Sequence, residues 1–165
     1  MFLRLISVPA NSINNTTANN ELQYFKEFES MPQHNIPVDA YDPILGDNNS
    51  PVKIIVFSDF QCPSCRYFSQ VLKDLESNNK GRFHVVFKHF PLDTACNSAI
   101  ANDVHPRACE AAMAAEAAKQ QGKFWEFHDA AFSTDLNKVD ETVCSNATRL
   151  NLDHKRFEEN RISQI

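Results

Sequence analysis

Long hydrophobic runs are absent from this 165-residue sequence. No stretch approaches the roughly 20 apolar residues that a helix needs to cross a bilayer, so we expect no membrane-spanning segment in the chain as given. Concentrated positive charge is also missing, because the net charge is −5 and the basic residues are scattered. A nucleic-acid backbone would meet no basic patch, which argues against a nucleic-acid partner.

The length fits one domain that can bury a core without cross-links or metals as its main support, so the five cysteines need another explanation. Residues 1–20 are predicted to be a disordered leader or the remnant of a secretion signal, because a short apolar run precedes a polar, Asn-rich stretch. Residues 21–165 are predicted to form the domain. Glu21–Ser30 carries apolar side chains at helical spacing, and Pro32 and Pro37 end this helix.

Two strands are predicted on either side of a helix that begins next to a cysteine pair. Val52–Phe60 is β-branched, aromatic and nearly uncharged, which is typical of a central strand buried on both faces. A helix with apolar residues at helical spacing runs from Pro63, and Arg82–Phe90 forms the second strand. This order predicts one right-handed parallel crossover.

Beyond Pro91 the pattern is helical throughout. Pro106 is predicted at the first position of an Ala-rich helix that ends at Gly122. The segment KFWEFHDAAF forms the next helix, and its aromatic residues are interpreted as core rather than as a ligand pocket because their spacing is helical. Two more helices are predicted in DETVCSNATRLN and DHKRFEENRISQI, the last with Asp153 as its N-cap.

Cys62 and Cys65 have the spacing of a redox pair. Because Pro63 favours the first turn of a helix, Cys62 is predicted at the N-cap and Cys65 one turn inside, on the same face. Unpaired N–H groups and the helix dipole at this end stabilise a thiolate. We therefore expect Cys62 to be the more acidic thiol, which attacks and leaves readily, and Cys65 to be the resolving thiol.

Two other interpretations of the pair stay open. A plain structural disulfide explains a covalent bond but not the placement of the pair after a buried strand. A metal site needs more ligands than these two sulfurs. The other candidate ligands lack the regular spacing of a zinc site: His84, His89, Cys96, His105 and Cys109. We expect neither a metal nor a cofactor.

Four sequence blocks between Gly46 and Phe132 occur in the order found in a known family: GDNNSPVKIIVFSDFQCPSCRYFSQVLKDL, VVFKHFPLDTACN, HPRACEAAMAAEAA and GKFWEFHDAAF. In these blocks the chain resembles the DsbA-like thioredoxin-fold thiol:disulfide oxidoreductases, including the thioredoxin domains found beside vitamin K epoxide reductase modules. The resemblance implies an α/β thioredoxin-like fold with a helical insertion at about residues 95–165. It also implies a periplasmic or other extracytoplasmic, secreted location.

The resemblance further implies roles for the residues of the cysteine motif. Cys62 and Cys65 correspond to the redox-active pair of the family. Pro63 and Ser64 lie between the two sulfurs, where the family tunes its redox potential. The substrates implied are thiols or disulfides of other proteins, and regeneration implies a separate membrane redox partner.

The sequence departs from the family pattern in two places. Thioredoxin-fold enzymes place a cis-proline after the helical insertion, whereas here no proline follows Pro106. We therefore expect a fold truncated before the cis-Pro strand pair, with an unpaired sheet edge. The second departure is Val56, which occupies the position of an acid that thioredoxins often bury. Asp59, three residues before Cys62, is interpreted as a solvated carboxylate at the strand end.

The remaining cysteines are interpreted structurally. A bridge between Cys96 and Cys109 would close a loop of about 15 residues and contribute about 3 kcal/mol, and we predict this structural disulfide. Two buried free thiols, or a relay pair that exchanges with Cys62, are the alternatives. The bridge would indicate an oxidising compartment. His105 is interpreted as a helix cap rather than a metal ligand, and Cys144 as a small buried hydrophobe.

The chain is interpreted as an enzyme that exchanges disulfides with protein thiols as an oxidase, isomerase or reductase. The sequence does not decide the direction. A rival hypothesis is a noncatalytic thioredoxin-like binding module that holds unfolded or partner chains through an open sheet edge and an apolar face. Phe60, Gln61 and Tyr67 adjoin the cysteines and are candidates for this surface. A metal carrier that uses Cys62 and Cys65 is a further rival.

Overall fold

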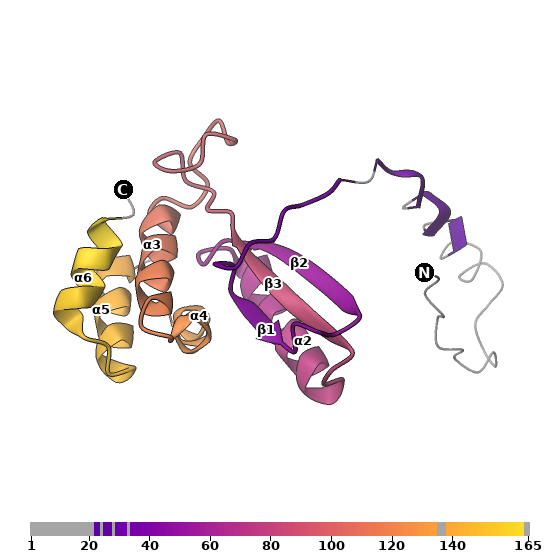
Figure 1. The fold of residues 1–165 in the computed structure, drawn as a ribbon. Coiled ribbons are helices and arrows are strands. Elements are labelled where there is room, and N and C mark those ends of the chain that lie inside the picture. Colours follow the sequence, from indigo (N-terminus) through magenta and orange to yellow (C-terminus); the bar gives the residue numbers. More distant parts are fainter. Residues whose placement is uncertain (1–21, 24, 28, 33, 135–137, 164–165) are drawn as a thin grey trace. The chain divides into compact units, whose positions relative to one another are not determined.

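The computed structural model describes residues 22–23, 25–27, 29–32, 34–134 and 138–163 (Figure 1). The chain divides into two compact units, Met1–Pro37 and Val38–Ile165. The leader predicted for residues 1–20 lies outside the described residues. The described residues between 22 and 30 are helical, in agreement with the helix predicted there.

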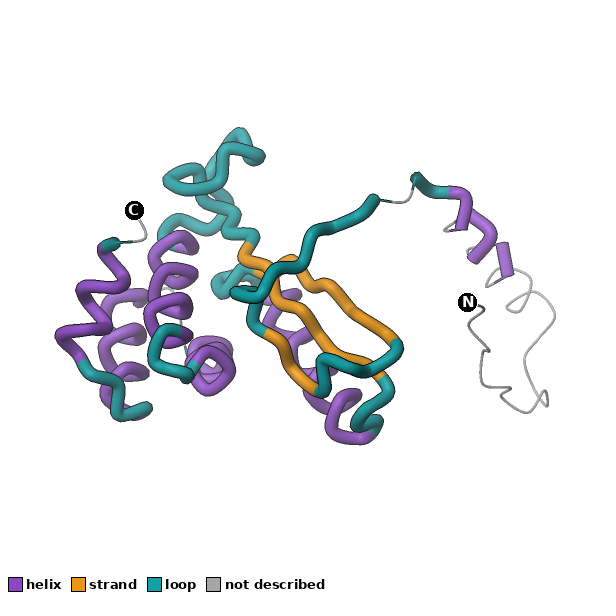
Figure 2. The backbone as a smooth tube through the Cα atoms, in the orientation of Figure 1, coloured by secondary structure: helices purple, strands orange, loops and turns teal. Residues whose placement is uncertain are grey.

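The second unit contains a three-stranded sheet, whose strands are β1 (Ile44–Gly46), β2 (Val52–Ser58) and β3 (Phe83–His89). In the order β1-β3-β2, β1 pairs antiparallel with β3 and β2 pairs parallel with it (Figure 2). Helix α2 (Pro63–Asn78) connects β2 to β3. The predicted strand, helix and parallel strand are therefore present in this order.

The central strand of this sheet is β3, and β2 lies at its edge. Residues 83–87 of β3 are all buried, whereas Ser58 is the only buried residue of β2. In the part of the chain that the structure describes, no strand pairs with the outer edge of β2, and Phe57 on it is 49% exposed. The prediction of a central strand buried on both faces is therefore wrong for Val52–Phe60. A segment rich in β-branched residues fits a pleated surface, but this composition does not indicate whether the strand lies at the centre or the edge of the sheet.

Four helices follow the sheet: α3 (Ala108–Lys119), α4 (Phe124–Ser133), α5 (Val139–Arg149) and α6 (His154–Ile162). They lie beside one another in Figure 1, and the fully buried alanines of α3 let its neighbours approach closely. Asp153 caps α6 as predicted, since its side chain accepts the N–H of Arg156 at 3.0 Å. Pro106 was expected to open α3 but precedes it, because Arg107 takes a left-handed backbone conformation with φ of 81°.

Helices α2 and α4 pack against the same face of β3. Leu72 of α2 belongs to a small hydrophobic cluster with Phe83 and Val85. Phe87, two residues further along β3, belongs to the larger cluster that contains the buried side of α4. Because alternate residues of a strand point to the same face, both helices cover one side of β3. Cys65, in the first turn of α2, packs against this larger cluster.

Candidate redox site

Cys62 occupies the N-cap of α2, and Pro63 is the first residue of the helix. The N–H of Cys62 donates to the carbonyl oxygen of Asp59 at 3.2 Å, and its carbonyl oxygen accepts the N–H of Arg66 at 3.1 Å. Its side chain makes no capping hydrogen bond, and the first turn of α2 contains no acidic residue. The local rule that places proline at a helix start thus positions the Cys62 sulfur at the positive end of the helix dipole.

Cys65 lies one turn inside α2 and is a free thiol, as is Cys62. Its side chain packs against the larger hydrophobic cluster. Burial raises the pKa of the Cys65 thiol, and the neighbouring Cys62 raises it further. Cys65 therefore holds its proton more tightly than a free cysteine. Pro63 and Ser64, between the two sulfurs, are both exposed, and their effect on the redox potential stays a prediction.

A mainly apolar cavity of about 240 Å³ separates α2 from α4 above the sheet. Cys65, Phe68 and Ser69 of α2 line one side, and Trp125 and His128 of α4 line the other. The aromatic residues of KFWEFH therefore contribute to the core, as predicted, and also to the wall of this cavity. The cysteine motif itself does not indicate that Ser69 or His128 lies beside the pair. The only sequence signal was the helical spacing of Cys65 and Ser69, four residues apart.

Val56 also lines this cavity, on the sheet side. This is the position at which the family resemblance implies a buried acid, so β2 contributes a hydrocarbon side chain there. Polar contacts also join α2 to α4 and to the C-cap of α4. Arg66 Nη2 donates to the carbonyl oxygen of Thr134 at 2.6 Å, and Lys73 Nζ forms an ion pair with Asp129 at 2.5 Å.

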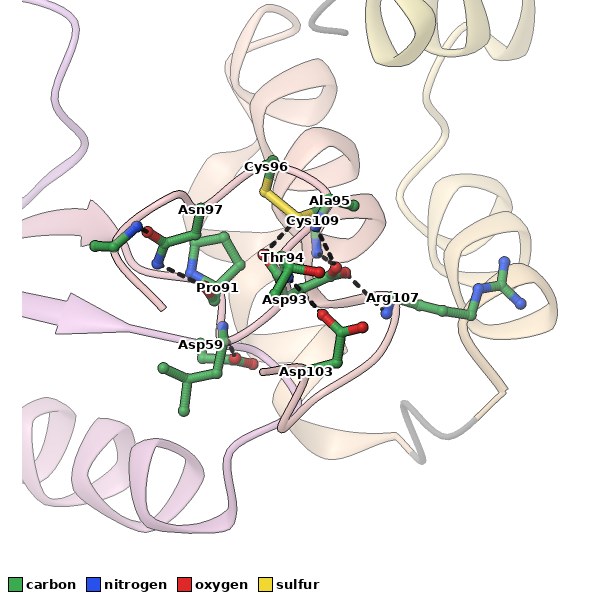
Figure 3. The surroundings of a disulfide bond; sticks show 12 residues. Asp59, Pro91, Asp93, Thr94, Ala95, Cys96, Asn97, Asp103, Arg107 and Cys109 are labelled. Carbon is green, nitrogen blue, oxygen red and sulfur yellow. Dashed lines mark hydrogen bonds between the residues drawn. A yellow bond between two sulfur atoms is a disulfide. The ribbon is translucent and has the colours of Figure 1, made fainter. Parts of the chain in front are cut away.

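Asp59 is buried, with only 3% of its surface exposed. One carboxylate oxygen accepts the N–H of Gln61 at 2.6 Å. The other accepts the N–H of Leu92 at 2.7 Å and contacts His105 Nδ1 at 2.9 Å (Figure 3 labels Asp59). The interpretation of Asp59 as a solvated carboxylate is therefore wrong. The side chain of His105 binds this carboxylate and does not cap α3, because residues 91–107 fold back onto the end of β2.

The loop before α3 contains a disulfide between Cys96 and Cys109, whose Cα atoms are 5.9 Å apart (Figure 3). Asp93 holds the same loop, since its carboxylate accepts the N–H groups of Ala95, Arg107 and Cys109 at 2.9 to 3.1 Å. The bonded sulfurs cannot serve as thiolate ligands in this state. Among the described residues, no group of three or more His, Cys, Asp or Glu side chains is arranged to hold a metal ion.

Two further expectations about side chains differ from the structure. Cys144 is exposed, because the buried stripe of α5 passes through Val143 and Ala147 on another side of the helix. Phe60 is 1% exposed and belongs to the larger cluster, so it contributes nothing to a client-binding surface. Tyr67, by contrast, is 74% exposed on α2.

The match to known families agrees with this architecture. A family model described as thioredoxin matches residues 39–164. The chain therefore belongs to the thioredoxin family. The DsbA-like resemblance and the α/β thioredoxin-like fold with a helical insertion are both confirmed.

Solved structures with the same fold come from bacterial proteins. A thioredoxin-like oxidoreductase from Silicibacter pomeroyi is 25% identical, with a TM-score of 0.61, over 74% of this chain and 64% of that one. The thiol-disulfide exchange protein α-DsbA2 from Wolbachia pipientis is 22% identical, with a TM-score of 0.58, over 88% of this chain and 68% of that one. The similarity to α-DsbA2 shows a shared fold and nothing beyond it.

Curated relatives are much longer than this chain. The Na(+)/H(+) antiporters NhaA 3 of Salinispora tropica and NhaA 1 of Salinispora arenicola are each 37% identical over 127 residues. The alignments cover 75% of this chain and 18% of each relative. The chain thus spans less than a fifth of the length of these proteins. Within the described residues, no helix has both the length and the apolar character needed to span a membrane.

Proposed function

We propose that the chain exchanges disulfides with protein thiols through Cys62, Pro63, Ser64 and Cys65. The observation that carries this proposal is the unequal placement of the two sulfurs. Cys62 lies at the N-terminus of α2, at the positive end of the helix dipole, whereas burial raises the pKa of Cys65. An attacking thiol and a resolving thiol need this difference. Two proteins with similar solved structures, an oxidoreductase and a thiol-disulfide exchange protein, support the same activity.

In the oxidising direction, a client thiolate attacks the Cys62 sulfur of a Cys62–Cys65 disulfide. The bond between the two cysteines breaks, and Cys65 leaves as a thiolate and takes up a proton. A second client thiolate then attacks the client sulfur of the mixed disulfide, and Cys62 leaves as a thiolate. The client gains one disulfide and loses two electrons, which remain in the two thiols of the chain. The reverse order of steps reduces or isomerises a client disulfide.

We infer a periplasmic or other extracytoplasmic location for this activity. The Cys96–Cys109 disulfide supports it, because structural disulfides persist in oxidising compartments. An oxidase in such a compartment needs an electron acceptor after every turnover. A membrane redox partner that reoxidises Cys62 and Cys65 fits this requirement.

A disulfide-reduction assay tests the proposal. The chain is supplied with a dithiol reductant and an insulin-like protein disulfide, and the rate is compared between wild type and two variants. Cys62→Ser removes the attacking sulfur, so we expect its rate to fall to that of the reductant alone. Cys144→Ser removes an exposed thiol away from the site and should retain the wild-type rate. A wild-type rate in Cys62→Ser would contradict thiol-disulfide exchange at this pair.

A noncatalytic binding module is the second candidate function. Exposed apolar side chains on α2, among them Tyr67, Phe68 and Val71, favour it. The outer edge of β2, with which no described strand pairs, favours it as well. This candidate predicts that a reduced, unfolded polypeptide binds Cys62→Ser as tightly as wild type, and that Tyr67→Ser weakens binding. Equilibrium titration by fluorescence anisotropy measures both. A metal carrier instead predicts stoichiometric zinc or copper in the purified protein, which elemental analysis measures.

A further inference from the structure

The exchange reaction moves a proton at Cys65, where water has limited access. Cys65 packs against the hydrophobic cluster and lines the cavity between α2 and α4. Its thiol must lose a proton before it can attack a mixed disulfide at Cys62, and must regain one when it is the leaving group. Val56 and Leu72 line the same cavity and cannot carry a proton. Ser58, which hydrogen-bonds to Cys65 and also lines the cavity, is itself buried. A polar group that leads away from the thiol is therefore needed.

Ser69 and His128 supply such groups on the two sides of the cavity. Ser69 follows Cys65 by four residues, so both side chains lie on the same side of α2. The Ser69 Oγ atom is 3.5 Å from Nε2 of His128, across from α2 on α4. Both residues line the cavity together with Cys65. Together they form a polar route between α2 and α4 along the wall of the cavity that Cys65 also lines.

The other ring nitrogen of His128 continues this route to the surface. His128 Nδ1 lies 3.1 Å from Oδ1 of Asp129, whose other oxygen pairs with Lys73 Nζ at 2.5 Å. Lys73 and Asp129 are both more than a third exposed, so solvent reaches this end. A carboxylate at Nδ1 favours the tautomer that carries its hydrogen there. Nε2 is then the free acceptor that points toward Ser69.

The surroundings of His128 keep its imidazole neutral and fixed. The residue is 3% exposed, and its ring lies 4.9 Å, between centroids, from the rings of Trp125 and Phe132. Burial lowers the pKa of His128, although Asp129 opposes this effect. The other charged or titratable groups that act on His128 are Lys73 on α2 and His89 on β3, and His89 pairs with Glu116.

We propose that Ser69 and His128 form the proton relay of Cys65, an inference that rests on the proposed exchange function. When Cys65 resolves a mixed disulfide, its proton passes to the Ser69 hydroxyl, whose own proton passes to His128 Nε2. The Cys65 thiolate attacks the Cys62 sulfur, the bond between Cys62 and the client breaks, and the client leaves as a thiolate. In the oxidising direction the imidazolium returns the proton to Cys65 by the same route. His128 acts on Cys65 through the Ser69 hydroxyl, so it is a positioning residue for this proton transfer.

Stopped-flow kinetics separate this step from the attack by Cys62. A Cys144→Ser background removes the exposed third thiol. The reduced protein is mixed with an equimolar aromatic disulfide whose released thiol is coloured. The first release reports attack by Cys62, and the second reports resolution by Cys65. Mass spectrometry verifies that Cys96 and Cys109 stay joined.

The variants compared are Ser69→Ala, Ser69→Thr and His128→Phe. Ser77→Ala is the matched control, because it removes a hydroxyl from an exposed position of the same helix, where the hydroxyl bonds to the carbonyl oxygen of Asp74. Ser69→Thr keeps the hydroxyl, and His128→Phe keeps the aromatic packing while it removes both ring nitrogens. Circular dichroism and thermal unfolding check the fold of each variant.

We expect Ser69→Ala and His128→Phe to slow the second release by about 100-fold near neutral pH, with the first release unchanged. Their second release should rise about tenfold per pH unit up to pH 8, because spontaneous ionisation of Cys65 then supplies the thiolate. The wild type, Ser69→Thr and Ser77→Ala should share a faster and flatter profile. A packing defect alone would not change the slope with pH.

Equal second-release rates in Ser69→Ala and Ser77→Ala at every pH would overturn the relay and leave the exchange function standing. Absence of the first release in the wild type would overturn the exchange function, and the relay with it. If His128→Phe does not fold, the contrast among Ser69→Ala, Ser69→Thr and Ser77→Ala decides the question alone.

Discussion

Replacement of Asp59 by alanine should destabilise the protein strongly. The Asp59 carboxylate is buried and is the acceptor of the N–H groups of Gln61 and Leu92, at 2.6 and 2.7 Å, and it also pairs with His105. These contacts join the loop that carries Cys62 to the loop that precedes α3. The substitution removes all of them at once and leaves a cavity the size of the carboxylate.

The size of the effect follows from these three contacts. Removing the partner of a buried N–H group costs about 1–3 kcal/mol, and hydrogen bonds to a charged group are at the upper end of the range. Because two N–H groups and one imidazole lose their acceptor, we expect Asp59→Ala to lower the free energy of unfolding by about 3–5 kcal/mol. This is a large part of the roughly 5–15 kcal/mol that is typical of a domain. Asp59→Asn keeps the shape and one acceptor oxygen, so it should cost less.

Urea unfolding followed by circular dichroism measures these free energies by linear extrapolation. Asp103→Ala is the matched control, because Asp103 accepts the N–H of Thr94 at 2.6 Å in the same loop but is exposed (Figure 3). The control should change stability far less than Asp59→Ala. A loss below about 1 kcal/mol in Asp59→Ala would refute the argument, since it would mean that the lost contacts contribute no more than one ordinary hydrogen bond.

Two further predictions concern the disulfide and the buried imidazole. The double variant Cys96→Ala, Cys109→Ala should lose about 3 kcal/mol of unfolding free energy; a reductant should lower the thermal midpoint of the wild type but leave that of the variant unchanged, and equal responses would contradict a stabilising bridge. Because burial lowers the folded-state pKa of His128, the unfolded state binds more protons, so stability should decline as pH falls below about 6.5. In urea titrations His128→Phe should flatten this decline, and an unchanged slope would contradict it.

The local sequence determined the start of α2 and the cap of α6. Pro63 has no N–H and a backbone angle already suited to the first turn of a helix, so the position of Cys62 follows from its immediate neighbours. Asp153 caps α6 for a similarly local reason, because its side chain reaches an N–H only three residues ahead. The pattern of apolar residues likewise located both strands next to the cysteine motif, since periodicity is a property of consecutive residues.

Tertiary packing decided the burial of Asp59, the edge position of β2 and the proximity of Ser69 to His128. Asp59 is buried by a loop that returns 33 residues later in the chain, at Leu92. Ser69 and His128 lie 59 residues apart in sequence and meet only because α2 and α4 cover one face of β3. A single sequence records which residues follow one another, whereas these contacts depend on which distant segments exclude water from the same side chain.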